Sequence, residues 1–184
     1  MLLLTTSRRP TSRIRTFCRD LARSIPNIIR INRGKLSLDG IGERALGFNA
    51  DRVVIVDRWK GGPGKIELFQ IGPEGLIPIF PLMYIAGIRL KREFEGIKAK
   101  PITSLTITTP PEKNPQVAKI AEFLSNFLDI PLSSIDEAVS EYSAAMHISL
   151  NASRRTQITF TLLSETVEVG PRVTISHLVW ETGK

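Results

Sequence analysis

Two stretches of the chain carry apolar side chains at helical spacing on one side and polar side chains on the other. They cover residues 12–25, ending at Pro26, and residues 114–128. Apolar positions at i, i+3, i+4 and i+7 predict amphipathic helices that bury one face in a core. The expected apolar faces are Ile14, Phe17, Cys18, Leu21, Ala22 and Ile25 in the first helix, and Val117, Ile120, Ala121, Leu124, Phe127 and Leu128 in the second.

Runs rich in β-branched and aliphatic residues, bounded by glycine, proline and asparagine, predict strands along much of the remaining chain. A weaker helix is expected at 37–48, capped by Ser37, and another at 134–143, where a serine and an acidic residue three positions later fit a capping box. The apolar run 76–92 is interrupted by prolines and a glycine and is not assigned. The expected strands are Leu2–Thr6, Asn27–Ile31, Val53–Trp59, Ile66–Ile71, Leu105–Thr109, Met146–Leu150, Gln157–Leu163 and Arg172–Trp180.

The two strong helices belong to a repeated pattern. Each follows an apolar residue and two threonines, Leu4–Thr6 and Ile107–Thr109, and each is followed by an Ile-Pro pair. The repeat predicts an α/β fold of duplicated half-domains, each a mixed sheet with flanking helices. We expect a single domain over residues 1–184, with half 1 at about 1–100 and half 2 at about 101–184. Ile14, Phe17 and Leu21 precede Val117, Ile120 and Leu124 by a constant offset of 103.

The positive charge of the chain is concentrated near its N-terminus. The chain carries a net charge of +7, yet residues 1–35 hold nine basic residues against one acid, Asp20. A segregated basic stretch is typical of proteins that bind polyanions, most often nucleic acid. Arg15, Arg19 and Arg23 lie at i, i+4 and i+8, where like charges destabilise an isolated helix, so binding explains this face better than stability does. The nine basic residues are Arg8, Arg9, Arg13, Arg15, Arg19, Arg23, Arg30, Arg33 and Lys35.

The segment that enters the first helix, residues 5–12, combines hydroxyl groups with Arg8 and Arg9. Free backbone N–H groups at a helix N-terminus, together with hydroxyls and arginines, form a phosphate-binding site. We therefore predict a phosphate-binding loop here. All nine basic residues of the N-terminal stretch are candidate RNA contacts.

A basic, glycine-rich segment, residues 60–65, predicts an exposed hairpin tip. Its end residues, Lys60 and Lys65, are expected as auxiliary RNA contacts. Trp59 is the one candidate for stacking on a base, and a packing role for it is the competing interpretation. We therefore expect contacts mainly to the backbone phosphates of structured RNA, with weak sequence preference.

Several classes of chemistry find no support in the sequence. Cys18 is the single cysteine and lies in an apolar stripe, and His147 and His177 have no cysteine or carboxylate at ligand spacing, so we expect neither disulfide nor metal site. No nucleotide-binding glycine motif or catalytic triad can be assembled, so we expect no enzyme, no cofactor and no small-molecule substrate. No apolar stretch approaches the roughly 20 residues of a membrane span, so we expect a cytoplasmic protein without a membrane partner.

Seven motifs follow one another in chain order: Thr5–Pro10, Phe17–Leu21, Ile25–Asn27, Asn32–Lys35, Ala50–Val56, Lys60–Glu67 and Gly170–Thr174. They resemble those of Brix-domain proteins, especially the short archaeal members, which are similar to the eukaryotic Brix protein that works with U3 small nucleolar RNA in the small-subunit processome. The resemblance implies halves similar to the anticodon-binding domain of class II aminoacyl-tRNA synthetases. It also implies a non-catalytic role in ribosome assembly, with precursor ribosomal RNA, guide RNA and ribosome assembly proteins as partners.

The sequence thus favours an RNA-binding ribosome biogenesis factor that acts in precursor rRNA processing and subunit assembly through its basic loop and helix. One alternative is a non-enzymatic protein-interaction scaffold for acidic partners, which should expose an apolar patch beside the basic face. Another is an enzyme acting on tRNA or other RNA, which should show a cleft with convergent carboxylates or histidines. The nearest candidates for catalytic carboxylates of such an enzyme are Asp51, Asp57 and Glu67.

Overall fold

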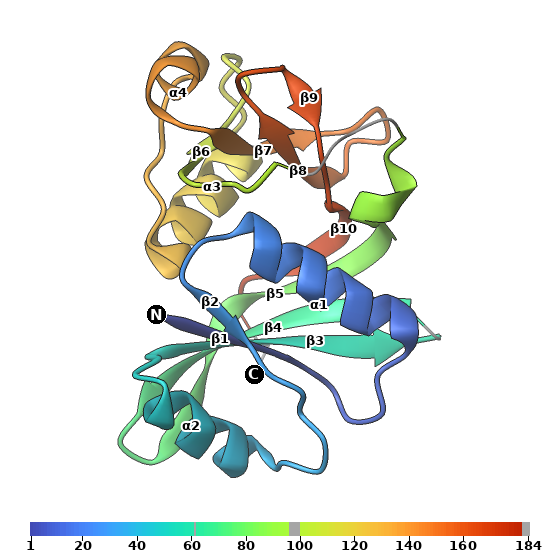
Figure 1. Ribbon diagram of the computed structural model, residues 1–184, viewed down its shortest axis with the longest axis vertical. Coiled ribbons are helices and arrows are strands. Elements are labelled where there is room, and N and C mark those ends of the chain that lie inside the picture. The colour runs from blue at the N-terminus through green and yellow to red at the C-terminus, as the bar shows by residue number, and fades with distance from the viewer. Residues whose placement is uncertain (61, 96–99, 182–184) are drawn as a thin grey trace. The chain divides into compact units, whose positions relative to one another are not determined.

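The computed structural model describes residues 1–60, 62–95 and 100–181 (Figure 1). The chain divides into two compact units, a first unit of Met1–Ala22, Asn27–Ala86 and Ser176–Lys184, and a second unit of Arg23–Pro26 and Gly87–Ile175. The expected halves met near residue 100, whereas the units change over between Ala86 and Gly87. The difference arises because the unassigned run 76–92 is largely a strand of the first unit, and because the chain returns to that unit at its end.

The first unit is built on a mixed sheet with strand order β2-β1-β3-β4-β5, followed by the end of β10. β1 pairs in parallel with both β2 and β3, while β3, β4 and β5 are antiparallel neighbours. Helices α1 and α2 lie on opposite faces of this sheet (Figure 1). The elements are β1 (Leu2–Thr6), α1 (Ser12–Ser24), β2 (Ile28–Arg30), α2 (Leu38–Gly47), β3 (Arg52–Trp59), β4 (Gly62–Gly72), β5 (Gly75–Arg89) and β10 (Arg172–Val179).

Both sheet faces of the first unit are covered by apolar packing. The α2 face holds a core in which Ile41 and Ala45 of the helix pack with Leu3, Ile55 and Phe69 of the strands. The predicted apolar stripe of α1 is confirmed except at Ala22, which is half-buried, and Ile14, Phe17 and Cys18 have no exposed area. The predicted cap of α2 is also confirmed, since the Ser37 hydroxyl accepts from the backbone N–H of Gly40.

In the second unit the strand order is β10-β8-β7-β6, with β9 paired to β8. β6 and β7 are parallel, and β7 and β8 are antiparallel. The buried residues of α3 include Ile120 and Leu124, as the sequence predicted. The elements are a 3-10 turn (Lys91–Glu93), β6 (Leu105–Thr108), α3 (Pro115–Leu128), α4 (Ile135–Glu141), β7 (Ala144–Leu150), β8 (Thr156–Leu162), β9 (Val167–Glu168) and the start of β10.

The two units repeat one order of elements. In the first unit a strand, a helix, a parallel partner strand and a second helix lead to β3 and its antiparallel neighbour β4. In the second unit β6 and α3 lead to a parallel bridge between Ile107 and Leu132, and then to α4, β7 and the antiparallel β8. The predicted mixed α/β fold with flanking helices is therefore confirmed.

The two repeated helices begin differently. Asn114 caps α3, and its Oδ1 accepts from the backbone N–H groups of Gln116 at 3.0 Å and Val117 at 3.1 Å. At the start of α1, the Thr11 hydroxyl accepts from the N–H of Ile14 over a longer 3.4 Å. Ser134 and Glu137 form the capping box of α4, as expected.

Two details differ from the sequence prediction. The run left unassigned contains most of β5, which accommodates Pro81 where the pairing with β4 shifts register, between Ile66 and Leu68. The predicted hairpin loop at 60–65 is shorter than expected, because β4 already begins at Gly62. Gly61 lies outside the described residues, as do residues 96–99 beside the expected boundary between the halves.

Replacing Gly170 with alanine should lower the free energy of unfolding by about 2 kcal/mol, because two costs combine. Gly170 has a left-handed φ of +68°, and an added Cβ would lie 2.5 Å from a ring carbon of Phe94. Chemical denaturation measures the change. As the matched control, Gly47→Ala should be neutral or stabilising, because nothing lies within 4 Å of its added Cβ and the residue is helical. Equal stability of the two variants would contradict the prediction.

Candidate nucleic-acid interface

The loop between β1 and α1 is fastened to the end of β3. The backbone N–H of Ser7 donates to the carbonyl of Val56 at 2.9 Å, and its hydroxyl accepts from the N–H of Arg58 at 3.2 Å. The Arg58 guanidinium donates to the carbonyl of Arg9 at 3.3 Å. Arg9 itself has a left-handed φ of +54°, which is uncommon for a residue with a side chain. Such a conformation, held by its surroundings, is a pointer to function.

This loop borders a pocket of about 470 Å³, which we call the arginine pocket. Four guanidinium groups line it against one carboxylate, so its charge is strongly positive. Arg9 and Arg58 are both exposed, and Arg33 is half-buried. The lining residues are Ser7, Arg8, Arg9, Arg33, Asp57 and Arg58.

Arg33 anchors the floor of this region. Its guanidinium donates from Nε to the carbonyl of Leu36 at 3.2 Å and from Nη1 to the carbonyl of Thr6 at 3.5 Å. Burial lowers the pKa of Arg33, and the positive charge of Arg8 lowers it further, against the opposing effect of nearby carboxylates. Arginine stays protonated at any physiological pH, so the lowered pKa of Arg33 reflects burial and the nearby charge of Arg8 rather than loss of its own charge.

On α1, Arg15, Arg19 and Arg23 are all exposed. Arg15 folds back to the start of its own helix, where Nη1 donates to the carbonyl of Pro10 at 3.0 Å and Nη2 to the Ser12 hydroxyl at 3.3 Å. The first turn of α1 contains no acidic residue. The positive charges therefore extend from the loop along the helix.

The remaining predicted contacts are scattered around this region. Arg13 is half-buried and already engaged, and Arg30 donates to the Asn32 side chain at 3.2 Å. Lys35 is exposed in the turn after β2, and Lys60 is exposed at the end of β3.

Lys65 is placed differently from the prediction, which had it on a flexible loop. It lies in β4, and its ammonium group is 2.9 Å from Glu67 and 3.7 Å from Asp57. Burial lowers the pKa of Lys65, but the hydrogen bond and charge of Glu67, together with Asp57, raise it above its usual value. Since this ammonium is already ion-paired, we leave Lys65 out of the interface. The expected place on a flexible loop is wrong because the pairing depends on strand register, whereas an RNA contact of Lys65 stays a prediction.

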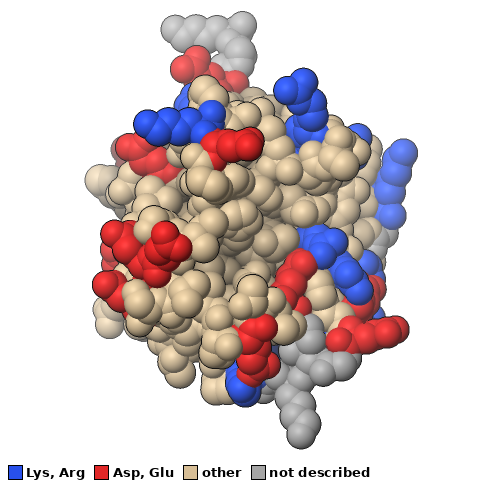
Figure 2. Space-filling model, turned by 90° about the horizontal axis from the view of Figure 1, so that it is seen from above, with Lys and Arg blue, Asp and Glu red and all other residues tan. Residues whose placement is uncertain are grey.

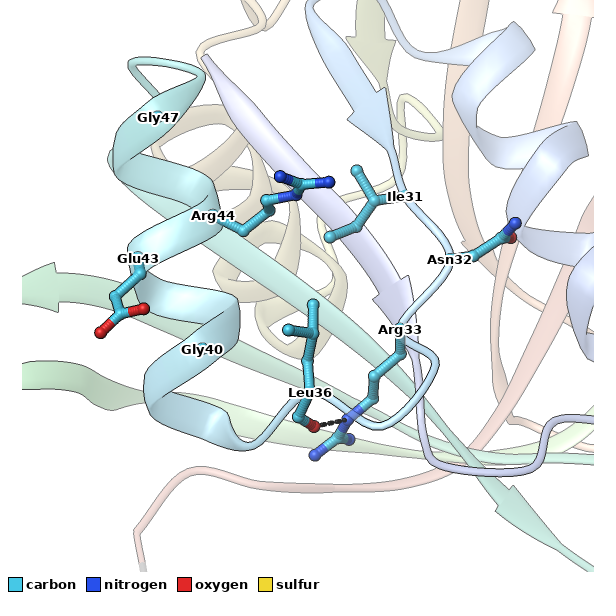
Figure 3. Close-up of a pocket in the computed structure, with 8 residues that line it drawn as sticks. All are labelled: Ile31, Asn32, Arg33, Leu36, Gly40, Glu43, Arg44 and Gly47. Atoms are coloured by element: carbon cyan, nitrogen blue, oxygen red, sulfur yellow. Dashed lines mark hydrogen bonds between the residues drawn. The ribbon is translucent and has the colours of Figure 1, made fainter.

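Sequence reasoning missed Arg58 and Arg44. Arg58 lies outside the basic N-terminal stretch, and its place in the arginine pocket follows from the end of β3 lying beside the loop. Arg44 lines a second hollow of about 800 Å³ between β2 and α2. Figure 3 shows its side chain extending toward Ile31, with Arg33 on the other side of Leu36.

Outside this region, charge is mixed. The face drawn in Figure 2 carries basic and acidic side chains in separate small groups, and neither sign covers it. This contrasts with the arginine pocket, where positive charge predominates.

Of the carboxylates named for an enzyme, Asp57 and Glu67 flank the Lys65 ammonium, whereas Asp51 lies apart from them. Asp51 is six strand residues from Asp57, or about 20 Å, and it contacts the N-terminal amine and Arg52, each at 3.3 Å. Burial would raise the pKa of Asp51, but hydrogen bonds and these positive charges bring it below its usual value. Among the described residues, no group of histidine, cysteine and acidic side chains could hold a metal ion, and no helix is long and apolar enough to cross a membrane.

Cys18 should be unreactive in the folded protein. Burial raises the pKa of its thiol to about 12, so it stays protonated at pH 8, and the side chain has no exposed area. A thiol-alkylating reagent at pH 8 should therefore label Cys18 slowly in the native protein and fully after denaturation, as measured by mass spectrometry. Native labelling at the rate of an exposed cysteine would show that α1 does not bury this face.

No family model matches the chain. It is similar to probable Brix domain-containing ribosomal biogenesis proteins from archaea. The relative from Methanococcus maripaludis is 31% identical over 136 residues, which cover 74% of this chain and 74% of that protein. The relative from Methanopyrus kandleri is 29% identical over 173 residues, 91% of this chain and 89% of the relative. Other matches span about half of the relative's length or less, as with the 44% covered in Pyrococcus horikoshii at 38% identity.

Solved structures agree with these relatives. A crystal structure of a probable ribosomal biogenesis protein from Aeropyrum pernix has a TM-score of 0.76 and 26% identity, and the match covers 97% of this chain and 98% of that one. The crystal structure of Mil, an archaeal Imp4-like protein, has a TM-score of 0.67 with 97% and 99% covered. At 20% identity this second likeness concerns the fold alone.

Proposed function

Because the chain belongs to the family of Brix domain-containing ribosomal biogenesis proteins, we propose that it acts in ribosome assembly by binding ribosomal RNA or its precursor. The arginine pocket is the observation that supports RNA as the ligand, since four guanidinium groups gather there around one carboxylate. The planar guanidinium fork suits phosphate oxygens, and its charge persists at all physiological pH values.

In this proposal the RNA backbone lies against the β1–α1 loop and then along α1. Arg8, Arg9 and Arg58 bind phosphates at the loop, and the start of α1 adds the positive end of a helix dipole. Arg19 and Arg23 lie about 6 Å and about 12 Å beyond Arg15 along the axis and so extend the basic surface by about two helical turns. Phosphate contacts carry no base information, so this part of the interface binds RNA with little sequence preference.

The proposal includes two further expectations. The protein takes part in precursor rRNA processing and subunit assembly, with guide RNA and assembly proteins as additional partners. Each half is expected to resemble the anticodon-binding domain of class II aminoacyl-tRNA synthetases, and structural superposition of each unit is the test of that likeness.

A protein-interaction scaffold is the second candidate, and one observation favours it. Leu38 and Leu46 of α2 are 46% and 60% exposed, on the helix that carries Arg44. Apolar side chains beside a basic surface are what a scaffold for acidic partners requires. RNA remains the better-supported ligand because the arginine pocket itself is polar and the apolar side chains lie outside its lining.

Crosslinking in a cell extract, followed by sequencing of the attached RNA, tests the proposal. Three proteins are compared: the wild type, a loop variant with Arg8, Arg9 and Arg58 changed to glutamine, and a control variant with Arg92, Lys113 and Arg155 changed to glutamine. The control removes the same charge from exposed positions in the second unit. Ribosomal precursor RNA should be enriched with the wild type and the control, and lost with the loop variant. Recovery of mixed messenger or transfer RNA without that enrichment would overturn the proposal.

A further inference from the structure

Four side chains form a row across neighbouring strands of the first unit. Asp57 of β3 pairs with Lys65 of β4, and Lys65 pairs with Tyr84 of β5. The Tyr84 ring then stacks on His177 of β10, with ring centroids 4.3 Å apart and planes 9° from parallel. The row lies on the α2 face of the sheet, because Asp57 follows the core residue Ile55 by two positions. Along the strands, the row lies outside the positions whose side chains pack in the core with α2.

The row begins at the arginine pocket and ends at the aromatic pair. Asp57 lines the pocket, and neighbouring strands are about 4.8 Å apart, so His177 lies roughly 14 Å away, three strands across. Lys65 pairs with Asp57 and Glu67, and the charge of Arg33 also acts on these two carboxylates, so two positive charges oppose two negative ones between the ends. An RNA strand whose phosphate occupies the pocket can therefore follow this face without meeting unbalanced negative charge.

Hydrogen bonds hold the aromatic pair in one arrangement. The Ser176 hydroxyl donates its single hydrogen to the carbonyl of Tyr84 at 3.1 Å. Its oxygen therefore accepts from Nδ1 of His177, also 3.1 Å away, which places the proton on Nδ1 and leaves Nε2 as an acceptor in the neutral ring. His177 is exposed although Tyr84 covers one of its faces, so the exposed area belongs to the opposite face and the Nε2 edge.

We propose that the Tyr84–His177 pair is a stacking site for an unpaired base of an RNA strand that has a backbone phosphate bound in the arginine pocket, three strands away. This inference rests on the proposed function, and it adds a preference for single-stranded segments to a surface that otherwise reads only phosphates. A base gains from stacking on a pre-oriented aromatic ring whatever its identity, because every base has a π-face. The fixed orientation of His177 lowers the entropy lost when the base stacks on it.

The experiment measures the affinity of two fluorescent probes, a single-stranded oligoadenylate of eight nucleotides and a blunt RNA duplex without unpaired bases. His177→Ala should weaken binding of the oligoadenylate by about 5- to 100-fold, the range for losing one stacked base. Binding of the duplex should stay within about twofold. His177→Phe keeps a stacking ring without the imidazole nitrogens and should restore most of the lost affinity. Phe48→Ala, which removes an exposed aromatic ring outside the row, should leave both affinities unchanged.

The outcomes separate this inference from the proposed function. If His177→Ala leaves the oligoadenylate affinity unchanged while the loop variant weakens both probes, the stacking site is wrong and the arginine interface stands. An equal loss for both probes in His177→Ala would also overturn stacking, because a duplex offers no free base. If the loop variant binds both probes as the wild type does, the proposed function fails. Thermal unfolding of each variant checks that the fold is retained.

Discussion

Truncating Leu21 or Leu124 to alanine should lower the free energy of unfolding by about 2–5 kcal/mol in either case. The two leucines occupy corresponding positions of α1 and α3 and are 8% and 4% exposed. Each truncation removes buried apolar atoms and leaves a cavity that the neighbouring side chains only partly fill. Urea denaturation followed by circular dichroism measures both variants.

Leu132→Ala is the matched control, because it makes the same chemical change at a leucine that is 46% exposed. Its effect should stay within about 0.5 kcal/mol. A loss below about 1 kcal/mol in either buried variant would mean that the helical phase deduced for that repeat is wrong.

Changing Arg8, Arg9 and Arg58 together to glutamine should reduce the slope of log affinity against log salt concentration by about two to three. Each phosphate contact contributes roughly 0.7–0.9 to this slope through the release of condensed counterions. Because this contribution fades near 1 M salt, losing three contacts should weaken binding at 0.1 M salt on the order of a hundredfold. Binding titrations at several salt concentrations measure both quantities.

The loss should be similar for RNA probes of unrelated sequence, since phosphate contacts do not read bases. The control variant at Arg92, Lys113 and Arg155 carries the same change in net charge and should keep the wild-type slope. If the loop variant is folded and retains both affinity and slope, the arginine pocket is not where RNA binds.

Local patterns were sufficient for the helices and for most strands. The stripe that includes Phe17 and the stripe that includes Ile120 each depend on side chains within one helix, and the cap at Ser37 depends on a residue three positions away. Signals of this kind are complete within a short window of sequence. The same local patterns also predicted the repeat, because the two helices share their flanking residues and the positions of their apolar residues.

Local sequence patterns could not predict features that depend on which strands pair across the sheet. Pro81 interrupts the apolar run of β5, yet it is tolerated at a register shift that exists only once β4 lies alongside. Tyr84 and His177 are neighbours because β5 and β10 meet in the first unit, although 92 residues separate Tyr84 from Ser176. The candidate site divides in the same way: the basic loop follows from composition, whereas the roles of Arg58 and Lys65 follow from register. The RNA contacts themselves stay a prediction.

The unequal starts of the two repeated helices have a dynamic consequence. Asn114 completes the first turn of α3 from within the chain, while α1 relies on the longer bond to Thr11. If an RNA phosphate accepts hydrogen bonds from the backbone N–H groups at the start of α1, RNA binding should protect these amides from hydrogen exchange. Hydrogen exchange at residues 12–14 should then slow when RNA binds, whereas exchange at Gln116 and Val117 should be equally slow with and without it. The two repeated helices would thus differ in their first turn, which is capped within the chain in α3 and is stabilised by bound RNA in α1.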